Sequence, residues 1–361
     1  MDWKSLFVFF FRSAAIESST RFEDLSNEII YEIFEYLDFF YLYQIFSNLN
    51  SRYHDLIRHS TVPIKLILSP MSYRTFQNFS KDFLITYQHR IHSIHSTNPF
   101  LFDLSPSPFR YLFQFYQLQT LLLEQFDSKH LKTLLSQLAL LPRLMCLTVK
   151  PLNAIAQHDH VYRQIFRLPA LIYCQVFSSS EPGIRQSLSI HCSQYTRIEH
   201  LIMSHPCSLG DLLLILTYVP QLRRLSCQIT QQPIISQQHF PSIVLSQWTH
   251  LSFKFITAPF TELEMFFTKI SHEIQVFRLS LDLDFDIGYA DAQRWETFIL
   301  IHLPKLRLFD PRFCVNNRNN LPYPAVFINR FTTSFWQQRQ WFFRYEYDHS
   351  SGEFYSIEPY R

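Results

Sequence analysis

The residues best suited to chemistry in this chain are small groups of histidines. His158, Asp159 and His160 stand together, but no third ligand accompanies them, so a polar loop is the favoured interpretation over a metal site. His92 and His95 have the i, i+3 spacing of a helix, yet the glutamate of a Glu-x-x-His metal motif is missing. These patterns predict no metal centre.

Other catalytic arrangements are also missing from the sequence. Asp282, Asp284 and Asp286 alternate as they would along a strand, but the glycine and final glutamate of a calcium loop are absent, which favours a solvated strand edge. No serine lies in a G-x-S-x-G turn, and the four glycines are too far apart for a G-x-G-x-x-G turn or a P-loop. We therefore expect a protein without catalytic residues and without a cofactor.

Composition restricts the partners and the compartment. The formal net charge of the 361 residues is +2, which offers no basic field for nucleic acid. Six cysteines without a C-x-x-C pair suggest reduced thiols, and hence a cytoplasmic or nuclear protein. The apolar run Leu6–Phe11 is shorter than a signal-peptide core, and Leu212–Leu216 is far shorter than a membrane span. No membrane association is expected.

The elements that would position functional residues recur along the chain. An apolar residue, a proline, any residue and a leucine repeat around Pro142, Pro169, Pro220 and Pro304, separated by 27, 51 and 84 residues. These separations are close to multiples of a period of about 27, which lies in the range of leucine-rich repeats.

An L-x-x-L-x-L pattern follows these junctions and fills the gaps between them. Its apolar positions are Leu118, Leu121, Leu123; Leu144, Leu147, Val149; Leu171, Cys174, Val176; Ile198, Leu201, Met203; Leu222, Leu225, Cys227; Ile274, Phe277, Leu279; and, three residues out of phase, Leu303, Leu306, Leu308. Residues 248–253 form a further copy. Apolar stripes predict helices over 128–141, 208–219, 261–270 and 289–303.

The pattern predicts an α/β fold in which residues 62–330 form an irregular leucine-rich-repeat-like solenoid of about eight repeats. Residues 331–361 are aromatic and are expected to form a C-terminal cap, with a hairpin of strands 340–347 and 353–357. A doubly wound α/β sheet is the structural alternative.

The segment 25–57 predicts three short amphipathic helices. Ser26 is expected to cap the first helix, and Asp38 and Asn50 the next two. Cys174 and Cys227, at core positions of the repeats, are expected to be buried. A three-helix segment of this size cannot bury all its apolar surface alone, so it is expected to need a partner.

This segment resembles the F-box, a three-helix module that docks onto a small adaptor of the Skp type. The matching residues are Leu25, Glu28-Ile29, Ile33-Phe34, Tyr36-Leu37 and Arg52. Ser26 replaces the usual proline, and the usual cysteine near the end of the motif is absent. The N-terminal three-helix F-box is placed at residues 21–60.

The resemblance implies a non-catalytic substrate-recognition subunit of a Skp-cullin-F-box type ubiquitin ligase. The F-box would bind the Skp-type adaptor and thereby the cullin, and the solenoid would capture an unknown protein substrate. The implied adaptor-binding residues are Leu25, Ile29, Ile30, Ile33, Phe34, Leu37, Leu42 and Ile45. The alternatives are an interaction scaffold with a vestigial F-box and, less favoured, an enzyme on the solenoid.

Arginines at positions between the strand leucines suggest where a substrate would bind. Arg143, Arg223 and Arg224 make the expected open face of the strands locally basic. Guanidinium groups pair well with carboxylates and phosphates, so a partner with an acidic or phosphorylated segment would suit this face. The competing interpretation is that these arginines are only solvated surface.

Overall fold

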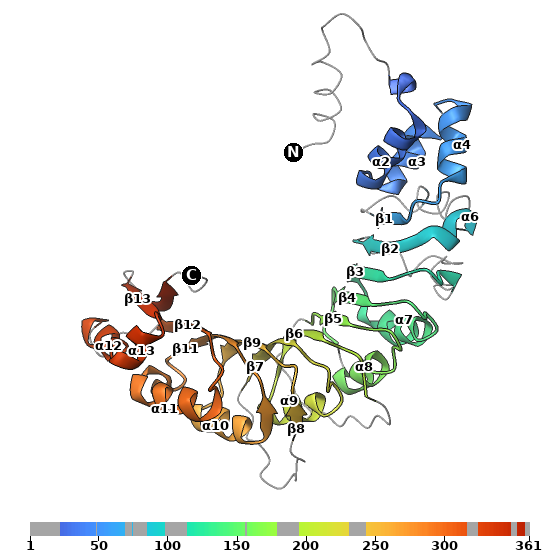
Figure 1. Cartoon of the computed structure of the whole chain (residues 1–361). Coiled ribbons are helices and arrows are strands. Elements are labelled where there is room, and N and C mark those ends of the chain that lie inside the picture. The colour runs from blue at the N-terminus through green and yellow to red at the C-terminus, as the bar shows by residue number, and fades with distance from the viewer. Residues whose placement is uncertain are drawn as a thin grey trace, which may run out of the picture. The chain divides into compact units, whose positions relative to one another are not determined.

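Helices dominate the first part of the chain and strands the second. The computed structural model describes residues 22–47, 49–68, 74, 85–97, 114–155, 157–178, 195–230, 243–315, 324–347 and 352–357. The chain divides into two units, residues 1–67 and 68–361. In Figure 1 the first unit carries blue helices, and the second runs from cyan to red.

The described part of the first unit contains three α-helices, preceded by a short 3-10 helix. They are η1 (Phe22–Asp24), α2 (Asn27–Tyr36), α3 (Phe39–Phe46) and α4 (Ser51–His59). The predicted caps of α3 and α4 are confirmed, because Asp38 Oδ1 accepts from Phe40 N at 3.3 Å and Asn50 Oδ1 from Tyr53 N at 3.0 Å. Ser26 holds the N-cap position of α2, but its side chain makes no capping hydrogen bond, so that expectation was wrong.

Aromatic packing and one arginine hold these helices together. The rings of Phe34 and Tyr53 lie 5.4 and 5.6 Å from that of Phe46, between centroids. The Arg52 guanidinium donates from Nη2 to the Leu25 carbonyl at 2.6 Å and to Asn27 Oδ1 at 2.8 Å. The start of α4 is thereby tied to the start of α2.

The second unit is built around a long sheet. Its strands are β2 (Ile91–Ser96), β3 (Thr120–Phe126), β4 (Cys146–Pro151), β5 (Tyr173–Val176), β6 (His200–Cys207), β7 (Arg224–Ile229), β9 (His250–Ile256), β11 (Val276–Asp282), β12 (Leu308–Val315), β13 (Phe342–Tyr347) and β14 (Gly352–Ile357). With β1 (Ile64–Leu68), at the boundary of the units, they form a twelve-stranded sheet of order β1-β2-β3-β4-β5-β6-β7-β9-β11-β12-β14-β13. From β2 to β12 neighbouring strands are parallel, whereas β14 pairs antiparallel with β12 and β13.

Helices connect many of these strands. They are α6 (Ile85–Tyr87), η3 (Gln88–Arg90), η6 (Ser128–His130), α7 (Leu131–Leu138), α8 (His158–Ile165), α9 (Leu209–Leu216), α10 (Phe260–Thr268), η7 (Ile287–Ala290), α11 (Ala292–His302), α12 (Pro324–Arg330) and α13 (Ser334–Gln338). A second, two-stranded sheet pairs β8 (Ile243–Leu245) with β10 (Ile270–His272). Helices α7 to α11 lie along one face of the long sheet (Figure 1).

The sheet register explains which face the helices cover. One row of directly paired, buried residues crosses neighbouring strands: Leu121, Leu147, Cys174, Leu201, Leu225, Leu251, Phe277 and Phe309. Side chains alternate between the faces of a strand, so their neighbours in sequence point the other way. The apolar face of the sheet packs against the helices, and these helices do not cover the opposite, more polar face.

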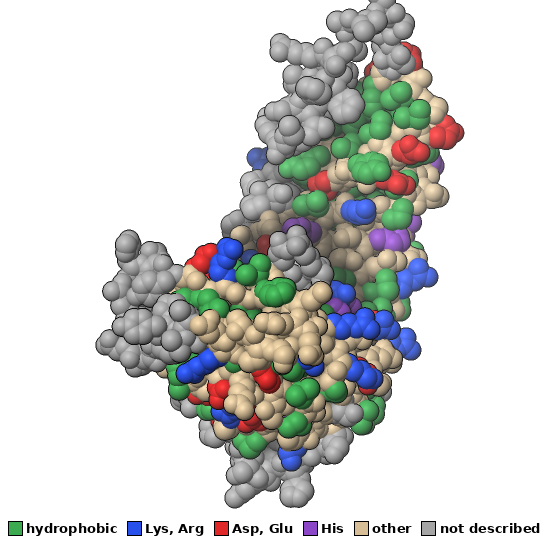
Figure 2. All heavy atoms as spheres, turned by 60° about the vertical axis from the view of Figure 1, so that its left-hand side comes forward, with side chains coloured by type: hydrophobic (Ala, Val, Ile, Leu, Met, Phe, Trp, Pro, Cys, Tyr) green, Lys and Arg blue, Asp and Glu red, His purple; other side chains and the backbone are tan. Residues whose placement is uncertain are grey.

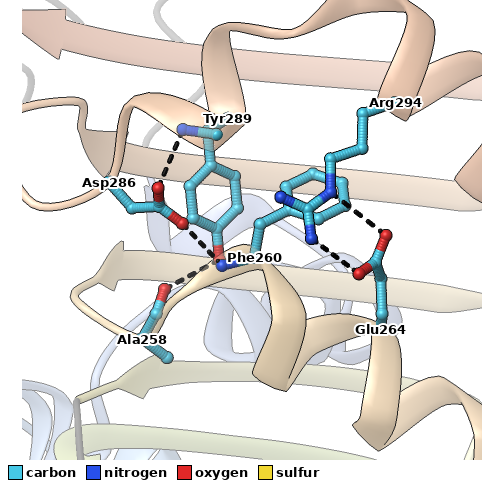
Figure 3. Close-up of polar contacts among 7 residues, drawn as sticks. Ala258, Phe260, Glu264, Asp286, Tyr289 and Arg294 are labelled. Carbon is cyan, nitrogen blue, oxygen red and sulfur yellow. Dashed lines mark hydrogen bonds and ion pairs between the residues drawn. The ribbon is translucent and has the colours of Figure 1, made fainter.

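Two loops on the helix side are joined by a network of polar contacts (Figure 3). The amide of Phe260, at the start of α10, donates to Asp286 Oδ2 at 2.8 Å, and the Tyr289 hydroxyl donates to the Ala258 carbonyl at 2.9 Å. Arg294 binds Glu264 through two hydrogen bonds, at 3.2 and 2.7 Å, while its guanidinium lies 4.3 Å from the Phe260 ring centroid. The network fixes α10 against the start of α11.

The predicted fold requires correction. The irregular leucine-rich-repeat-like solenoid of about eight repeats with a separate aromatic cap was wrong; the structure is an α/β fold with one twelve-stranded, mostly parallel sheet. The repeated segments form one continuous hydrogen-bonded sheet, and the aromatic segment adds β13 and β14 to it. Strand order follows chain order up to β12, without the reversal of a doubly wound sheet.

Several local expectations also differ from the structure. His158 and His160 lie in the first turn of α8 and not in a loop, and His92 and His95 lie on β2 and not on a helix. Helices predicted over 128–141, 208–219, 261–270 and 289–303 are found as α7, α9, α10 and α11 with shorter bounds. The two strands of the C-terminal hairpin pair antiparallel as expected.

The aspartates that were expected to line a strand edge have different surroundings. Only Asp282 lies on β11; Asp284 follows in a turn, where its amide donates to Asp282 Oδ1 at 3.0 Å. Asp286 caps η7 by accepting from Gly288 N at 2.8 Å. The carboxylates of Asp282 and Asp286 thus accept hydrogen bonds from backbone donors in the segment that follows the strand.

The domain bounds 21–60, 62–330 and 331–361 stay predictions. The run Leu6–Phe11 and Cys192 lie outside the described residues. Cys174 and Cys227 are buried as expected, and Cys146, Cys207 and Cys314 are likewise free thiols.

Candidate functional site

Two surfaces, one on each unit, combine exposed side chains in a way that could bind a partner. The first is the outer stripe of α2, formed by Ile29, Ile33, Tyr36 and Leu37. Ile29 is 45% exposed, Tyr36 90% and Leu37 38%, and Ile33 is half-buried. These residues recur at helical spacing, so they lie along one side of the helix. We call them the α2 stripe.

The neighbouring side of α2 is the one that faces the core. Ile30 is fully buried and Phe34 is 6% exposed, and the ring of Phe34 packs beside that of Phe46. Carboxylates alternate with the exposed apolar residues: Glu28, Glu32 and Glu35 are all exposed. Hydrophobic (green) and acidic (red) side chains lie near one another on the upper right of the surface in Figure 2. A partner for this stripe would offer apolar contacts with a basic rim.

The predicted adaptor-binding residues occupy three kinds of position. Ile29 and Leu37 are exposed; Leu25, Ile33 and Ile45 are half-buried; Ile30, Phe34 and Leu42 are buried. The exposed and half-buried residues can contact another protein directly, whereas the buried ones can only support the surface from beneath.

The second surface is a groove of about 660 Å³ on the second unit. It lies over β5, β6, β7, β9, β11 and β12. Most of its lining residues alternate with the buried row along these strands, and Leu201, Leu225 and Leu251 of that row also contribute. Its ionisable lining residues are His200, Arg224, His250, Lys254, Arg278, Asp310 and Arg312. We call it the basic groove.

Sheet register places the charged residues of the groove. His200, Arg224 and His250 pair directly across β6, β7 and β9. Lys254 and Arg312 are separated by one strand, with Ser280 of β11 paired to both. Strands lie about 4.8 Å apart, so the Cα atoms of Lys254 and Arg312 are about 10 Å apart, a gap that two long side chains can close.

One cation in the groove is balanced by an acid. Arg278 Nε lies 3.6 Å from Asp310 Oδ2, and the Ser356 hydroxyl donates to Asp310 Oδ1. Arg224, Lys254 and Arg312 are exposed, and no carboxylate forms an ion pair with them within the described part of the chain. The groove therefore has a positive field in a chain that is nearly neutral.

The two histidines of the groove, His200 and His250, have lowered pKa values. Partial burial and then Arg224 lower the pKa of His200 below its usual value. Partial burial and the nearby Arg224 and Arg278 likewise lower the pKa of His250. Both imidazoles are therefore neutral at pH 7, where each can donate or accept a hydrogen bond.

The predicted substrate-binding arginines are not all brought together. Arg224 lines the basic groove, but Arg223, just before β7, pairs with Glu199 at 3.1 Å and contacts Gln247 at 3.3 Å. Arg143 precedes β4 and donates to Gln117 Oε1 at 2.6 Å. Strands β5 and β6 separate β4 from β7, so Arg143 lies away from the other two.

Sequence reasoning missed most of the groove, including Lys254, Arg278 and Arg312. The sequence pattern that could have predicted these residues is the alternation of polar with apolar residues in β9, β11 and β12. The last repeat was placed on Leu303, Leu306 and Leu308, whereas β11 pairs Phe277 with Phe309 and Leu279 with Pro311. With that register, Asp310 and Arg312 point to the groove.

Other chemistry has little support among the described residues. No three His, Cys, Asp or Glu side chains are arranged there to hold a metal ion. Among the described residues, every helix is too short or too polar to span a bilayer. Compared with known proteins, the chain matches no family model and no curated protein sequence. The α2 stripe and the basic groove are the two candidate binding surfaces among the described residues.

Proposed function

We propose that this chain is the non-catalytic substrate-recognition subunit of a Skp-cullin-F-box type ubiquitin ligase. The first unit would dock onto a Skp-type adaptor, which links it to a cullin, and the second unit would hold a protein substrate. The observation that carries the proposal is the α2 stripe, because its apolar residues face outward within a segment that resembles the F-box.

The energetics of docking support this role. Burying a Leu or Ile side chain contributes about 1.5–3 kcal/mol, so Ile29, Ile33 and Leu37 together can supply a substantial part of a stable interface. Tyr36 is also exposed and adds an aromatic ring that interfaces commonly use. The residues beneath the stripe already fill the core of the first unit, so no rearrangement is needed to expose it.

A second candidate function is a protein-interaction scaffold whose F-box is vestigial. One observation favours it: Ser26 stands where the family has a proline, and its side chain leaves the start of α2 uncapped. Such a helix start is less rigid than one fixed by a proline ring. This scaffold would still bind partners through the second unit but would not recruit a cullin.

The test is copurification of the full chain with a Skp-type adaptor and a cullin. The proposal predicts that both are recovered, and that Ile29→Asp with Leu37→Asp abolishes recovery. The matched control is Leu300→Asp with Ile301→Asp, which changes two exposed apolar residues of α11 in the same way. Adaptor without cullin would favour the scaffold, and equal recovery with the α2 variant would overturn the proposal.

A further inference from the structure

The strongest unexplained feature of the second unit is the arrangement of cations in the basic groove. Lys254 and Arg312 flank Ser280 on one row of paired residues, at exposed positions. An ammonium and a guanidinium on either side of a hydroxyl can together donate several hydrogen bonds to one anion.

A second group of donors lies elsewhere in the same groove. Arg224 sits between His200 and His250 on a row four residues before that of Lys254. A rise of about 3.3 Å per residue separates the rows by about 13 Å along the strands, and the two groups are also centred on different strands. The groove can therefore receive two anionic groups of one extended ligand.

The remaining lining points to a polypeptide. Ser226 and Ser252 form a polar floor between the two rows, and Tyr173, Ile202 and Val276 supply apolar contacts beside it. A volume of about 660 Å³ suits a few residues of an extended chain. Nucleic acid fits less well, because Asp310 lies in the groove and the net charge is only +2.

We propose that the basic groove binds a phosphorylated segment of a partner protein, with the phosphate held between Lys254 and Arg312 above Ser280. A second acidic or phosphorylated residue of the same segment lies at Arg224. The inference deepens the proposed function and depends on it in one respect, since it makes this partner the substrate of the ligase.

A phosphate suits this position better than a carboxylate. A phosphoryl group carries nearly two negative charges at pH 7 and three acceptor oxygens, enough for the Lys254 ammonium, the Arg312 guanidinium and the Ser280 hydroxyl together. A carboxylate has one charge and two oxygens. Phosphorylation of the partner would therefore control capture.

The experiment uses the full chain, immobilised at about 0.15 M salt, with fluorescent peptide libraries as probes. One library has a central phosphoserine between degenerate positions, and two matched libraries carry serine or glutamate instead. We expect at least tenfold greater retention of the phosphoserine library. Lys254→Glu with Arg312→Glu should reduce that retention at least tenfold, and Lys254→Gln with Arg312→Gln should reduce it severalfold.

The matched control is Lys132→Glu with Arg167→Glu, the same charge change at exposed residues on the helix side, which should retain the library like wild type. Equal retention of the phosphoserine and serine libraries would overturn the inference. Stronger binding to phosphatidylserine vesicles or to single-stranded oligouridine, lost in the Lys254 and Arg312 variants, would also overturn it by assigning the groove to a membrane or to RNA.

The adaptor experiment separates this inference from the proposed function. Adaptor and cullin recovery without phosphopeptide binding would refute only the role of the groove. Phosphopeptide binding without adaptor recovery would leave the groove assigned and refute the ligase function. The groove variants change no residue of the first unit, so they should leave adaptor recovery unchanged.

Discussion

Tyr162 donates a hydrogen bond to His205 in the interior of the second unit, with 2.5 Å between Oη and Nε2. The other ring nitrogen, Nδ1, lies 3.2 Å from the Pro206 carbonyl, so Nδ1 carries the proton and Nε2 accepts. The His158 ring lies 4.2 Å away, between centroids. This arrangement requires a neutral imidazole.

The first prediction concerns stability against pH. Burial, and then the nearby His158, lower the pKa of His205 to about 3. Between this value and the usual pKa of about 6.5, the unfolded state binds a proton that the folded state does not, so stability falls as the pH falls. The expected loss from this one group approaches about 1.4 kcal/mol for each pH unit below 6.5.

Chemical denaturation at pH 7 and pH 5 measures this effect. His205→Phe should reduce the slope of the unfolding free energy against pH by the amount that corresponds to about one bound proton. The substitution should also lower stability at pH 7, because it leaves the Tyr162 hydroxyl without its acceptor. Burial also lowers the pKa of His272, to about 4, so part of the slope should remain. An unchanged slope in the variant would contradict the prediction.

Arg52 is predicted to stabilise the first unit. Its guanidinium donates to the Leu25 and Glu23 carbonyls and to Asn27, which joins α4 to the segment that begins α2. Arg52→Ala should lower the stability of these helices by about 1–2 kcal/mol, since hydrogen bonds from a charged group are lost. Amide hydrogen exchange of α2 measures the change.

Arg58→Ala is the control for this prediction, because Arg58 is exposed on the same helix. Its substitution should change exchange by less than about 0.5 kcal/mol. Equal effects of the two substitutions would show that the Arg52 contacts do not account for the loss.

The α2 stripe is predicted to be dispensable for folding. Ile29→Asp and Leu37→Asp should each change the unfolding free energy by no more than about 0.5 kcal/mol, because both side chains are exposed. Phe34→Ala, on the buried side of the same helix, should cost about 3 kcal/mol or more. Denaturant titration of the free chain measures all three. A large loss in the aspartate variants would show that the stripe is part of the core.

Arg294 and Glu264 are predicted to be energetically coupled. The guanidinium binds the carboxylate through two hydrogen bonds and lies over the Phe260 ring. Arg294→Lys keeps the charge but loses the paired geometry, and should cost about 1 kcal/mol. A double-mutant cycle with Glu264→Gln should give a coupling energy of about 0.5–1 kcal/mol, and additive single effects would argue against coupling.

Some structural features could be predicted from the residues alone, for a local physical reason. The oxygens of Asp38 and Asn50 cap helices within three residues of themselves, so short-range sequence is enough to predict them. The buried row from Leu121 to Phe277 follows from apolar residues at fixed intervals, since each strand must bury one face. The α/β class and the apolar stripe of α2 arise in the same way.

The extent of the sheet and the membership of the groove were decided only by tertiary structure. Apolar repeats show that each segment buries one face, but backbone pairing made them one twelve-stranded sheet that includes the C-terminal hairpin. Lys254, Ser280 and Arg312 are far apart in sequence and meet because register aligns β9, β11 and β12. Register shifted by one residue would turn every side chain to the opposite face, so periodicity alone could not bring these cations together.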